Sequence, residues 1–482
     1  MKLLNEYTGK RETNYIPESD VEELQVSELF DSSQLRLDSL QLPSISEPEL
    51  MRHFIKLSDM NYHVDKGMYP LGSCTMKYSP KVSEDLASLP GFMNLHPETP
   101  ETAIQGALKL MFELGEYLKE LSGMDAITLQ PKAGAHGELT GLLIARGYFN
   151  SIGKDKKIVL IPDTAHGTNP ASSARAGFKV REVKSSEDGI LEPDHLKEVM
   201  SEDVALLMIT NPNTLGIFES HIGELARILH SYGALLYMDG ANLNALMGKA
   251  KMSDFGVDIM HFNLHKTFST PHGGGGPGSG PVAVRGYLKE FLPVPIIDFD
   301  NEKYYFNWDI KHSIGKVSGF YGAFSVMIKA YAYIRMLGAI GLREVSEQAV
   351  INSNYLLTKL KEDYNLPYGK NCMHEFVLSG SNFKEFGIRA LDIAKRLLDY
   401  GFHAPTIYFP LIVHEALMVE PTETESRESL DGFINAMKGI AREAKENPDK
   451  LKKAPQTTPV GRLDEVKANK ELNVRWRREL PE

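Results

Sequence analysis

A lysine beside a histidine stands just before the most glycine-rich segment of this 482-residue chain. Lys266 follows His265, and glycine fills six of the eight positions in 273–280. Such a segment gains little from regular structure and suits backbone that comes close to another group. A lysine whose pKa is lowered by burial or nearby charge can form a Schiff base with pyridoxal phosphate. Lys266 is therefore a candidate for covalent attachment of that cofactor, although most lysines are solvated and glycine runs are often mobile loops.

A second candidate, Asp239, closes the apolar run 234–239. A carboxylate at the buried end of such a run needs a cationic or hydrogen-bonding partner. The ring nitrogen of pyridoxal phosphate is one such partner, and an ion pair there keeps the ring protonated and able to accept electrons. Asp239 and Lys266 together therefore favour a pyridoxal phosphate site.

Two further turns carry residues suited to the same ligand. Gly134 and Ala135 open a predicted helix, where free backbone N–H groups and the helix dipole favour a phosphate. His166 lies in the polar turn 163–170. Its ring could stack on an aromatic cofactor or simply cap the following helix, and its sequence context leaves both interpretations open.

The elements that must position these residues alternate between strands and helices. Near-continuous apolar strands separated by helices are typical of a mostly parallel sheet covered on both faces. Ligands bind at the carboxyl ends of such strands, where the candidate residues gather. Strands are predicted at 126–130, 157–161, 178–183, 205–210, 234–239 and 257–261, and helices at 102–122, from 134 through 144, at 193–201 and at 222–232.

Four segments of different composition divide the chain. We expect an N-terminal arm and linker at 1–95 and a large ligand-binding domain at 96–325. A smaller α/β domain is expected at 326–453, with a helix from 325 to 337, a strand at 375–378 and helices at 388–398 and 430–444. The polar tail, 454–482, is expected to wrap over the surface or a partner.

The loop 69–81 is rich in turn formers and small polar residues. It is either a structured linker or a loop whose Ser73, Thr75 and Lys77 face an anionic ligand. Cys74 is interpreted as a structural thiol, because no base or orienting group is evident beside it in sequence.

Composition limits the classes of partner. The net charge of −11 argues against nucleic acid and anionic membranes as main partners. The segment after Met1 is polar, and no apolar run reaches the roughly 18–20 residues that a membrane span needs. The two cysteines fit a reducing compartment and indicate neither a disulfide framework nor a cysteine-based metal site. We expect a cytoplasmic protein without a structural metal.

Longer stretches together resemble the P-protein of the glycine cleavage system, glycine dehydrogenase (decarboxylating), over nearly the whole chain. They are 69–77, 129–138, 165–172, 239–242, 263–280, 401–406 and 418–423. Single-chain members of that family carry two homologous halves, and this chain resembles the half that keeps the cofactor lysine. The resemblance implies the aspartate aminotransferase fold (fold type I), with a mostly parallel seven-stranded sheet and a smaller C-terminal α/β domain. It also implies a split enzyme in which this chain is subunit 2 and pairs with a subunit 1, as an expected two-plus-two heterotetramer.

The resemblance further implies roles for individual residues. Lys266 would form the Schiff base, Asp239 would pair with the pyridine nitrogen, and His166 would stack on the ring. The other implied cofactor-binding residues are Gly134 and Ala135 at the phosphate, Ala241, and His265 and Thr267 as phosphate or positioning groups. His136 stands where single-chain members tend to have glutamine, so it receives no fixed role.

The implied reaction is decarboxylation of glycine, with transfer of the aminomethyl group to the lipoyl arm of H-protein and release of CO2. The nearest alternative is another fold type I enzyme, an aminotransferase or an amino acid decarboxylase. An aminotransferase for dicarboxylic acids needs an arginine clamp, and the only arginine associated with these stretches is Arg175, just beyond 165–172. A non-catalytic scaffold subunit has no need of Lys266, and a phosphate-binding module is disfavoured because 273–280 lacks the GxxxxGK[ST] order.

Overall fold

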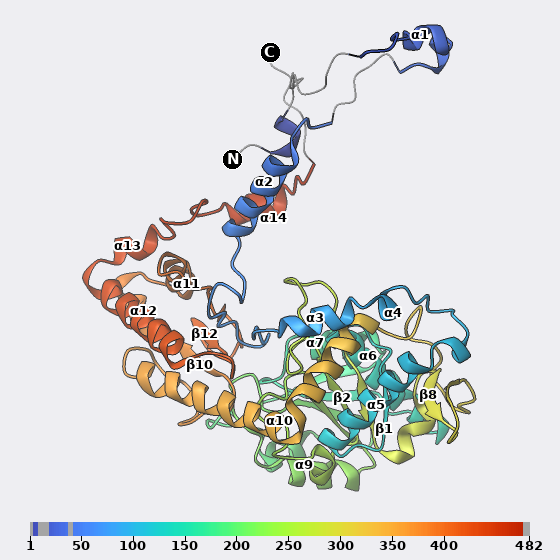
Figure 1. Ribbon diagram of the computed structural model, residues 1–482. Coiled ribbons are helices and arrows are strands. Elements are labelled where there is room, and N and C mark those ends of the chain that lie inside the picture. Colours follow the sequence, from blue (N-terminus) through green and yellow to red (C-terminus); the bar gives the residue numbers. More distant parts are fainter. Residues whose placement is uncertain (1–2, 8–18, 37–41, 476–482) are drawn as a thin grey trace. The chain divides into compact units, whose positions relative to one another are not determined.

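The computed structural model describes residues 3–7, 19–36 and 42–475. The chain forms two compact units, Met1–Tyr62 and His63–Glu482 (Figure 1). The finer boundaries predicted after residues 95, 325 and 453 stay predictions. Parts of the predicted arm and tail (1–2, 8–18, 37–41 and 476–482) lie outside the described residues.

Among the described residues of the first unit, one helix has substantial length, α2 (Glu47–Met60). Ser46 and Glu49 form a capping box at its start, with a proline in the first turn, so its first amide groups are satisfied. His53 is buried and packs edge-on against Tyr7, with ring centroids 6.0 Å apart. The short elements of this unit are η1 (Leu4–Glu6), α1 (Val26–Leu29) and η2 (Ser32–Gln34).

A seven-stranded sheet organises the second unit, with strand order β1-β7-β6-β5-β4-β2-β3. Strand β7 alone runs antiparallel to its neighbours. The expected mostly parallel seven-stranded sheet is thus confirmed, with β7 as the strand that the apolar pattern alone did not predict. The strands are β1 (Ala126–Thr128), β2 (Ile158–Pro162), β3 (Lys179–Val183), β4 (Val204–Thr210), β5 (Leu235–Gly240), β6 (Ile259–Phe262) and β7 (Val282–Val284).

Helices cover both faces of this sheet, so successive residues of a strand enter two different cores. Leu207 and Leu236 belong to the core that includes α5 and α9, whereas Leu206 and Leu235 belong to the core that includes α6. Each buried leucine contributes about 2–5 kcal/mol relative to alanine at such sites. The helices around the sheet are α5 (Gln105–Ser122), α6 (Gly134–Ser151), α7 (Thr168–Arg175), α8 (Pro193–Val199) and α9 (Ile222–Ser231).

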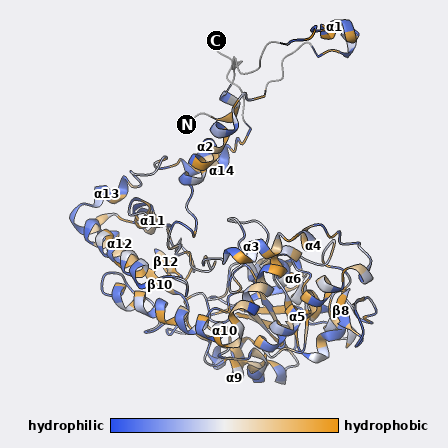
Figure 2. Cartoon of the chain, in the orientation of Figure 1, coloured by the Kyte–Doolittle hydropathy of each residue, from blue (hydrophilic) through white to orange (hydrophobic). Residues whose placement is uncertain are grey.

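Helix α10 (Phe324–Leu360) is broken at Gly338, whose backbone has φ 62° and ψ −174°. A residue with a side chain would be strained there. Among the described residues, α10 alone is long and apolar enough to cross a membrane by length and composition. Its buried side chains instead pack into two protein cores: Met327 belongs to the core that includes α5 and α9, and Leu356 belongs to a core built mainly from the C-terminal part of the chain, here called the small-domain core. Figure 2 shows blue and orange residues interleaved along α10 and α12, as expected of helices with one buried face.

The C-terminal part has an antiparallel sheet in the order β10-β12-β11, packed against helices. The strands are β10 (Phe376–Ser379), β11 (Thr406–Ile407) and β12 (Ala416–Val419), and the helices are α11 (Ala390–Asp399), α12 (Arg427–Glu446), α13 (Pro448–Lys452) and α14 (Glu465–Lys470). The sequence pattern predicted α12 as the last helix. Among the described residues, two short helices, α13 and α14, follow it. Arg462 fixes the start of the tail by donating to Asp392 Oδ1 (2.7 Å) and to the Leu451 carbonyl (3.0 Å).

Smaller elements complete the second unit. A hairpin of β8 (Ile296–Phe299) and β9 (Tyr304–Asn307) was not predicted by the sequence pattern. The other short helices are α3 (Lys81–Ala87), α4 (Pro90–Met93), η3 (Glu101–Ala103), η4 (Met252–Phe255), η5 (Gly286–Phe291) and η6 (Ser381–Phe386).

Candidate active site

One cavity of about 540 Å³ brings together most of the residues singled out by the sequence. It lies at the carboxyl ends of β5 and β6, the edge at which parallel sheets bind ligands. Its lining residues are Gly72, Ser73, Cys74, Gly134, Ala135, Glu138, His166, Gly167, Thr168, Asp239, Ala241, Asn263, Lys266, Thr406 and Phe409.

Lys266 is 8% exposed and faces this cavity. Its amine makes no hydrogen bond or ion pair with any residue that the structure describes. A buried amine without a partner is costly unless a ligand completes the site. This arrangement fits a lysine that attaches a cofactor covalently.

Asp239 is buried at the end of β5 and is held by several donors. The Asn169 amide donates to Oδ2 at 3.0 Å, and the Ala241 backbone N–H donates to Oδ1 at 3.0 Å. Burial alone would raise the pKa of Asp239, but the nearby His261 and His166 together with these two donors lower it below its usual value. The cavity thus contains an anionic carboxylate, as binding of a protonated ring nitrogen requires.

His166 is fixed by a chain of side chains rather than left as a simple helix cap. Its Nδ1 lies 2.9 Å from the Thr168 hydroxyl, which donates to Glu138 Oε1 at 2.5 Å. The second oxygen of Glu138 accepts a 2.5 Å hydrogen bond from Ser172. Burial, followed by the charge of Lys266, lowers the pKa of His166, which favours the neutral ring.

The turn before α6 depends on glycine for its close packing. A Cβ on Gly280 would lie 2.1 Å from the Ala133 carbonyl oxygen, and one on Gly134 would lie 2.7 Å from the Asn263 side chain. The Asn263 Oδ1 atom is buried and has no hydrogen-bond partner among the described residues. The first amides of the 18-residue helix α6 therefore border the cavity, as a phosphate site requires.

His265 and Thr267 flank Lys266 but do not line the cavity. The Thr267 hydroxyl accepts a 2.8 Å hydrogen bond from the Leu243 N–H, and His265 Nδ1 accepts one of 3.2 Å from the Ser279 N–H. Burial and the charge of Lys266 lower the pKa of His265 to about 4. These contacts support a positioning role better than a direct phosphate contact. His136 likewise holds backbone, since its Nε2 lies 2.9 Å from the Val317 carbonyl oxygen.

One part of the loop 69–81 faces the cavity, and another part packs within the protein as a structured linker. Ser73 and Cys74 line the cavity, whereas Thr75 and Lys77 contact protein carboxylates. Lys77 Nζ lies 2.8 Å from Glu423 Oε1, and that partner raises the pKa of Lys77 to about 12 against the lowering effect of burial. The Cys74 thiol lies 3.8 Å from His272 Nε2, and burial raises its pKa, so it is not activated as a nucleophile.

Several lining residues were not expected from the sequence. Glu138, Thr168 and Asn263 lie inside the stretches 129–138, 165–172 and 263–280 that resemble the family. Their closeness in sequence to Gly134, His166 and Lys266 was the one signal that could have indicated them. Phe409 comes from the C-terminal part and packs edge-on against His166, with ring centroids 5.8 Å apart. Arg175 is exposed, and no arginine lines the cavity among the described residues, which therefore offer no clamp of the kind that a dicarboxylate aminotransferase uses.

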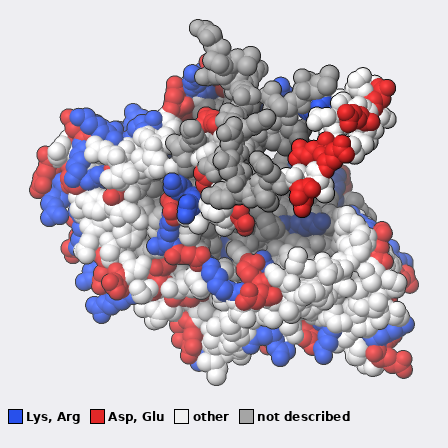
Figure 3. Space-filling model, turned by 45° about the horizontal axis from the view of Figure 1, so that its top comes forward, with Lys and Arg blue, Asp and Glu red and all other residues white. Residues whose placement is uncertain are grey.

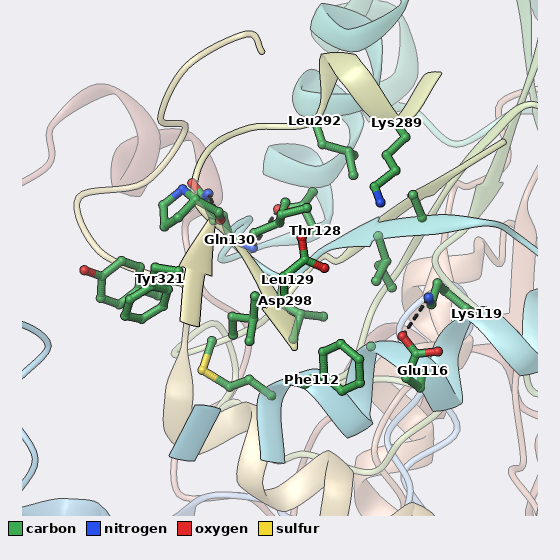
Figure 4. Close-up of a pocket in the computed structure, with 18 of the residues that line it drawn as sticks. Phe112, Glu116, Lys119, Thr128, Leu129, Gln130, Lys289, Leu292, Asp298 and Tyr321 are labelled. Carbon is green, nitrogen blue, oxygen red and sulfur yellow. Dashed lines mark hydrogen bonds and ion pairs between the residues drawn. The ribbon is translucent and has the colours of Figure 1, made fainter. Parts of the chain in front are cut away.

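A second cavity, shown in Figure 4, lies beside the edge strand β1. Two of its charged side chains, Lys119 and Glu116, pair with each other at 2.7 Å. The Gln130 amide donates to the Pro295 carbonyl at 3.0 Å. This cavity lacks the lysine–aspartate pair and is not the candidate active site.

A mostly parallel seven-stranded sheet with a buried lysine and aspartate at one cavity defines a pyridoxal phosphate enzyme of fold type I. The family model for class-V aminotransferases matches residues 137–285, and that for the glycine dehydrogenase C-terminal domain matches residues 345–458. A crystal structure of the glycine decarboxylase (P-protein) of the glycine cleavage system superposes with a TM-score of 0.69 at 22% identity. That alignment covers 86% of this chain and 95% of the other. A NifS-like protein superposes with a TM-score of 0.60 at 16% identity, over 79% of this chain and all of the other.

Curated relatives are more similar still. The probable glycine dehydrogenase (decarboxylating) subunit 2 of Chloroherpeton thalassium is 56% identical over 96% of this chain and 94% of its own length. The protein of the same description from Chlorobaculum tepidum is 57% identical over 94% of this chain and 95% of its own length. The chain therefore belongs to the family of glycine dehydrogenase (decarboxylating) subunit 2.

Proposed function

We propose that the protein decarboxylates glycine with pyridoxal phosphate held on Lys266, as part of the glycine cleavage system. In this proposal it passes the aminomethyl group to the lipoyl arm of an H-protein and releases CO2. The observation that carries the proposal is the placement of Lys266 and Asp239 in one cavity of a chain from this family.

The residues around the cavity fit the cofactor. Lys266 would hold it covalently, Asp239 would bind its ring nitrogen, and the N-terminus of α6 at Gly134 and Ala135 would bind its phosphate. His166 would contact the ring face, and Ala241 would adjoin Asp239. When bound, the cofactor would supply an electron sink for the electron pair left behind as the carboxylate departs.

The side chains of this chain would assist that step through charge and exclusion of water. The anionic Asp239 would stabilise a positive charge on the ring nitrogen at one side of the cavity, and the neutral His166 presents an uncharged ring. No arginine lines the cavity among the described residues, so a substrate carboxylate would have no guanidinium clamp stabilising its charge. A poorly solvated carboxylate loses CO2 more readily than a well-paired one, which favours decarboxylation over transamination.

We further propose that a subunit 1 and a lipoylated H-protein are the partners, with a two-plus-two heterotetramer as the expected assembly. Helices α3 and α4 and the turn between them support a protein partner, because they carry exposed apolar side chains of the kind found at interfaces. These side chains are Val82, Leu86, Leu89 and Met93. We propose no nucleic acid partner, because the net charge is −11. Figure 3 shows acidic and basic residues interspersed over the visible face.

We propose a cytoplasmic location from the use of cysteine. Both cysteines are free thiols, Cys74 half-buried and Cys372 buried, as suits a reducing compartment.

Exchange of labelled bicarbonate into the carboxyl group of glycine tests this function. The assay needs the purified protein with pyridoxal phosphate, subunit 1 and lipoylated H-protein. We expect exchange with the wild-type protein and none with Lys266→Ala. Transamination of another amino acid, without glycine exchange, would instead assign the protein to the alternative fold type I activities.

A further inference from the structure

A buried tyrosine and histidine stand behind the carboxylate of Asp239. Tyr237 and Asp239 lie two positions apart on β5, and His261 is the register partner of Asp239 on the adjacent strand β6. His261 Nε2 lies 3.3 Å from Asp239 Oδ1, and His261 Nδ1 lies 3.0 Å from the Tyr237 hydroxyl. The three side chains form a row from the interior of the sheet to the cavity.

Helix α6 leaves room for this row by carrying two glycines on the facing side. A Cβ on Gly141 would lie 2.4 Å from Tyr237 Cε2, and one on Gly137 would lie 3.2 Å from His261 Cβ. Tyr237 and His261 thus fill the space between α6 and the sheet. The rest of this face of the sheet packs aliphatic and aromatic side chains. Two buried polar groups at such a site are costly unless each completes a hydrogen bond.

The geometry favours one arrangement of the protons. The Tyr237 hydroxyl lies 3.0 Å from His261 Nδ1 and 3.4 Å from the Gly137 carbonyl oxygen, so the histidine is the nearer acceptor. Donation to Nδ1 leaves the imidazole proton on Nε2, facing Asp239 Oδ1. The Asn169 amide and the Ala241 N–H donate hydrogen bonds to that carboxylate, whereas His261 Nε2 faces it at 3.3 Å without a hydrogen-bond partner among the described residues. All three members of the row are at most 2% exposed, so solvent cannot replace any of these contacts.

A metal ion is a poorer interpretation of the same cluster. Ligand atoms of Glu138, Asp239 and His261 do lie within 4.8 Å of one another. However, the Glu138 oxygens already accept hydrogen bonds from Thr168 and Ser172, and Asp239 accepts from Asn169 and Ala241. These four donors already stabilise the two carboxylates as anions without a cation.

We propose that His261, oriented by the Tyr237 hydroxyl, is a positioning residue that holds the Asp239 carboxylate as an anion aimed at the cofactor ring. The proposal rests on the pyridoxal phosphate site of the proposed function. It assigns His261 and Tyr237 to cofactor affinity and to the charge state of the bound ring, without direct contact with substrate.

Titration of the cofactor-free protein with pyridoxal phosphate tests the proposal, followed by a pH titration of the visible absorption band. Tyr237→Phe removes only the hydroxyl, and loss of one such hydrogen bond should weaken cofactor binding about 3- to 10-fold. His261→Leu removes the imidazole that faces the buried Asp239 carboxylate and should weaken binding about 10- to 100-fold. Both variants should also shift the pH at which the band changes, whereas His261→Gln, which retains an N–H donor, should recover most of the wild-type behaviour.

Tyr364→Phe is the matched control, because the buried Tyr364 hydroxyl donates to the Met437 carbonyl within the small-domain core. It should leave cofactor affinity and the band unchanged. Equal affinity and equal band titration in wild type, Tyr237→Phe and His261→Leu would overturn the inference while leaving the proposed function intact. If His261→Leu does not fold, the isosteric Tyr237→Phe decides the outcome. Failure of the wild-type protein to bind the cofactor at all would instead remove the proposed function and this inference together.

Discussion

The Thr75 hydroxyl donates a 2.7 Å hydrogen bond to Glu420 Oε1, joining the loop at the cavity to the residue that follows β12. The Asn244 amide donates to the same oxygen at 2.8 Å. Beside it, Glu375 Oε2 accepts a 2.8 Å hydrogen bond from the Ser73 N–H, where the backbone has φ 66°. Two buried carboxyl groups of the C-terminal part therefore fix a wall of the cavity.

The two carboxyl groups make stability depend on pH. Burial and the neighbouring Glu420 raise the pKa of Glu375 to about 8, whereas an unfolded glutamate titrates near about 4.3. Between these values the folded state binds more protons, so the free energy of unfolding falls as pH rises toward about 8. Glu375→Gln cannot ionise, so we expect a smaller fall between about pH 5 and pH 8 in urea unfolding.

Glu443→Gln is the control for this measurement. The pKa of Glu443 is lowered to about 2, chiefly by Arg396 and Lys450 against the raising effect of burial. Glu443 is therefore ionised in both the folded and the unfolded state between about pH 5 and pH 8, and its contribution to the free energy of unfolding is constant there. The Glu443→Gln variant should show the wild-type dependence of that free energy on pH. Equal slopes in wild type and Glu375→Gln would show that Glu375 does not titrate as described.

The ion pair between Lys77 and Glu423 should be costly to break. Its atoms lie 2.8 Å apart, and the two side chains are only 1% and 8% exposed. Lys77→Ala leaves a buried carboxylate without its partner, so the free energy of unfolding should drop by about 3–5 kcal/mol. Lys197→Ala breaks an exposed pair with Asp194 and should change little. Urea unfolding measures both, and similar losses in the two variants would contradict this account of Lys77.

Gly280→Ala should disturb the turn that precedes α6. The added Cβ would lie 2.1 Å from the Ala133 carbonyl oxygen, a backbone atom that cannot move without shifting the helix N-terminus. We expect a loss of about 1–3 kcal/mol in the free energy of unfolding and weaker binding of pyridoxal phosphate. Gly223→Ala, whose Cβ meets open space on α9, should leave cofactor binding unchanged. Wild-type cofactor affinity in Gly280→Ala would show that the turn does not form the phosphate site.

The sheet could be predicted because its strands are buried on both faces. A strand such as β4, with nearly every residue buried, must be apolar throughout, so its sequence is distinctive. Strand β7 has only three residues and follows the glycine loop, so its apolar pattern is too short to separate from a loop. The hairpin of β8 and β9 is partly exposed and lacks a clear alternation.

The candidate site could be predicted in part for a similar reason. Lys266, Asp239 and His166 follow strands of one parallel sheet, and such strand ends share an edge. The contribution of Phe409 depends on how the C-terminal part packs against the sheet, which no local pattern encodes. The pairing of His261 with Asp239 depends on the register between β5 and β6. That register is set by packing across the whole sheet.

The central claim is that a single cofactor joins Lys266 and Asp239. Borohydride reduction of the protein with pyridoxal phosphate, followed by mass spectrometry of its peptides, tests this claim most directly. We predict one cofactor per chain, attached to the peptide that contains Lys266, and no attachment in Lys266→Ala. An unmodified Lys266 peptide, with the cofactor on another lysine or on none, would contradict the assignment of this site.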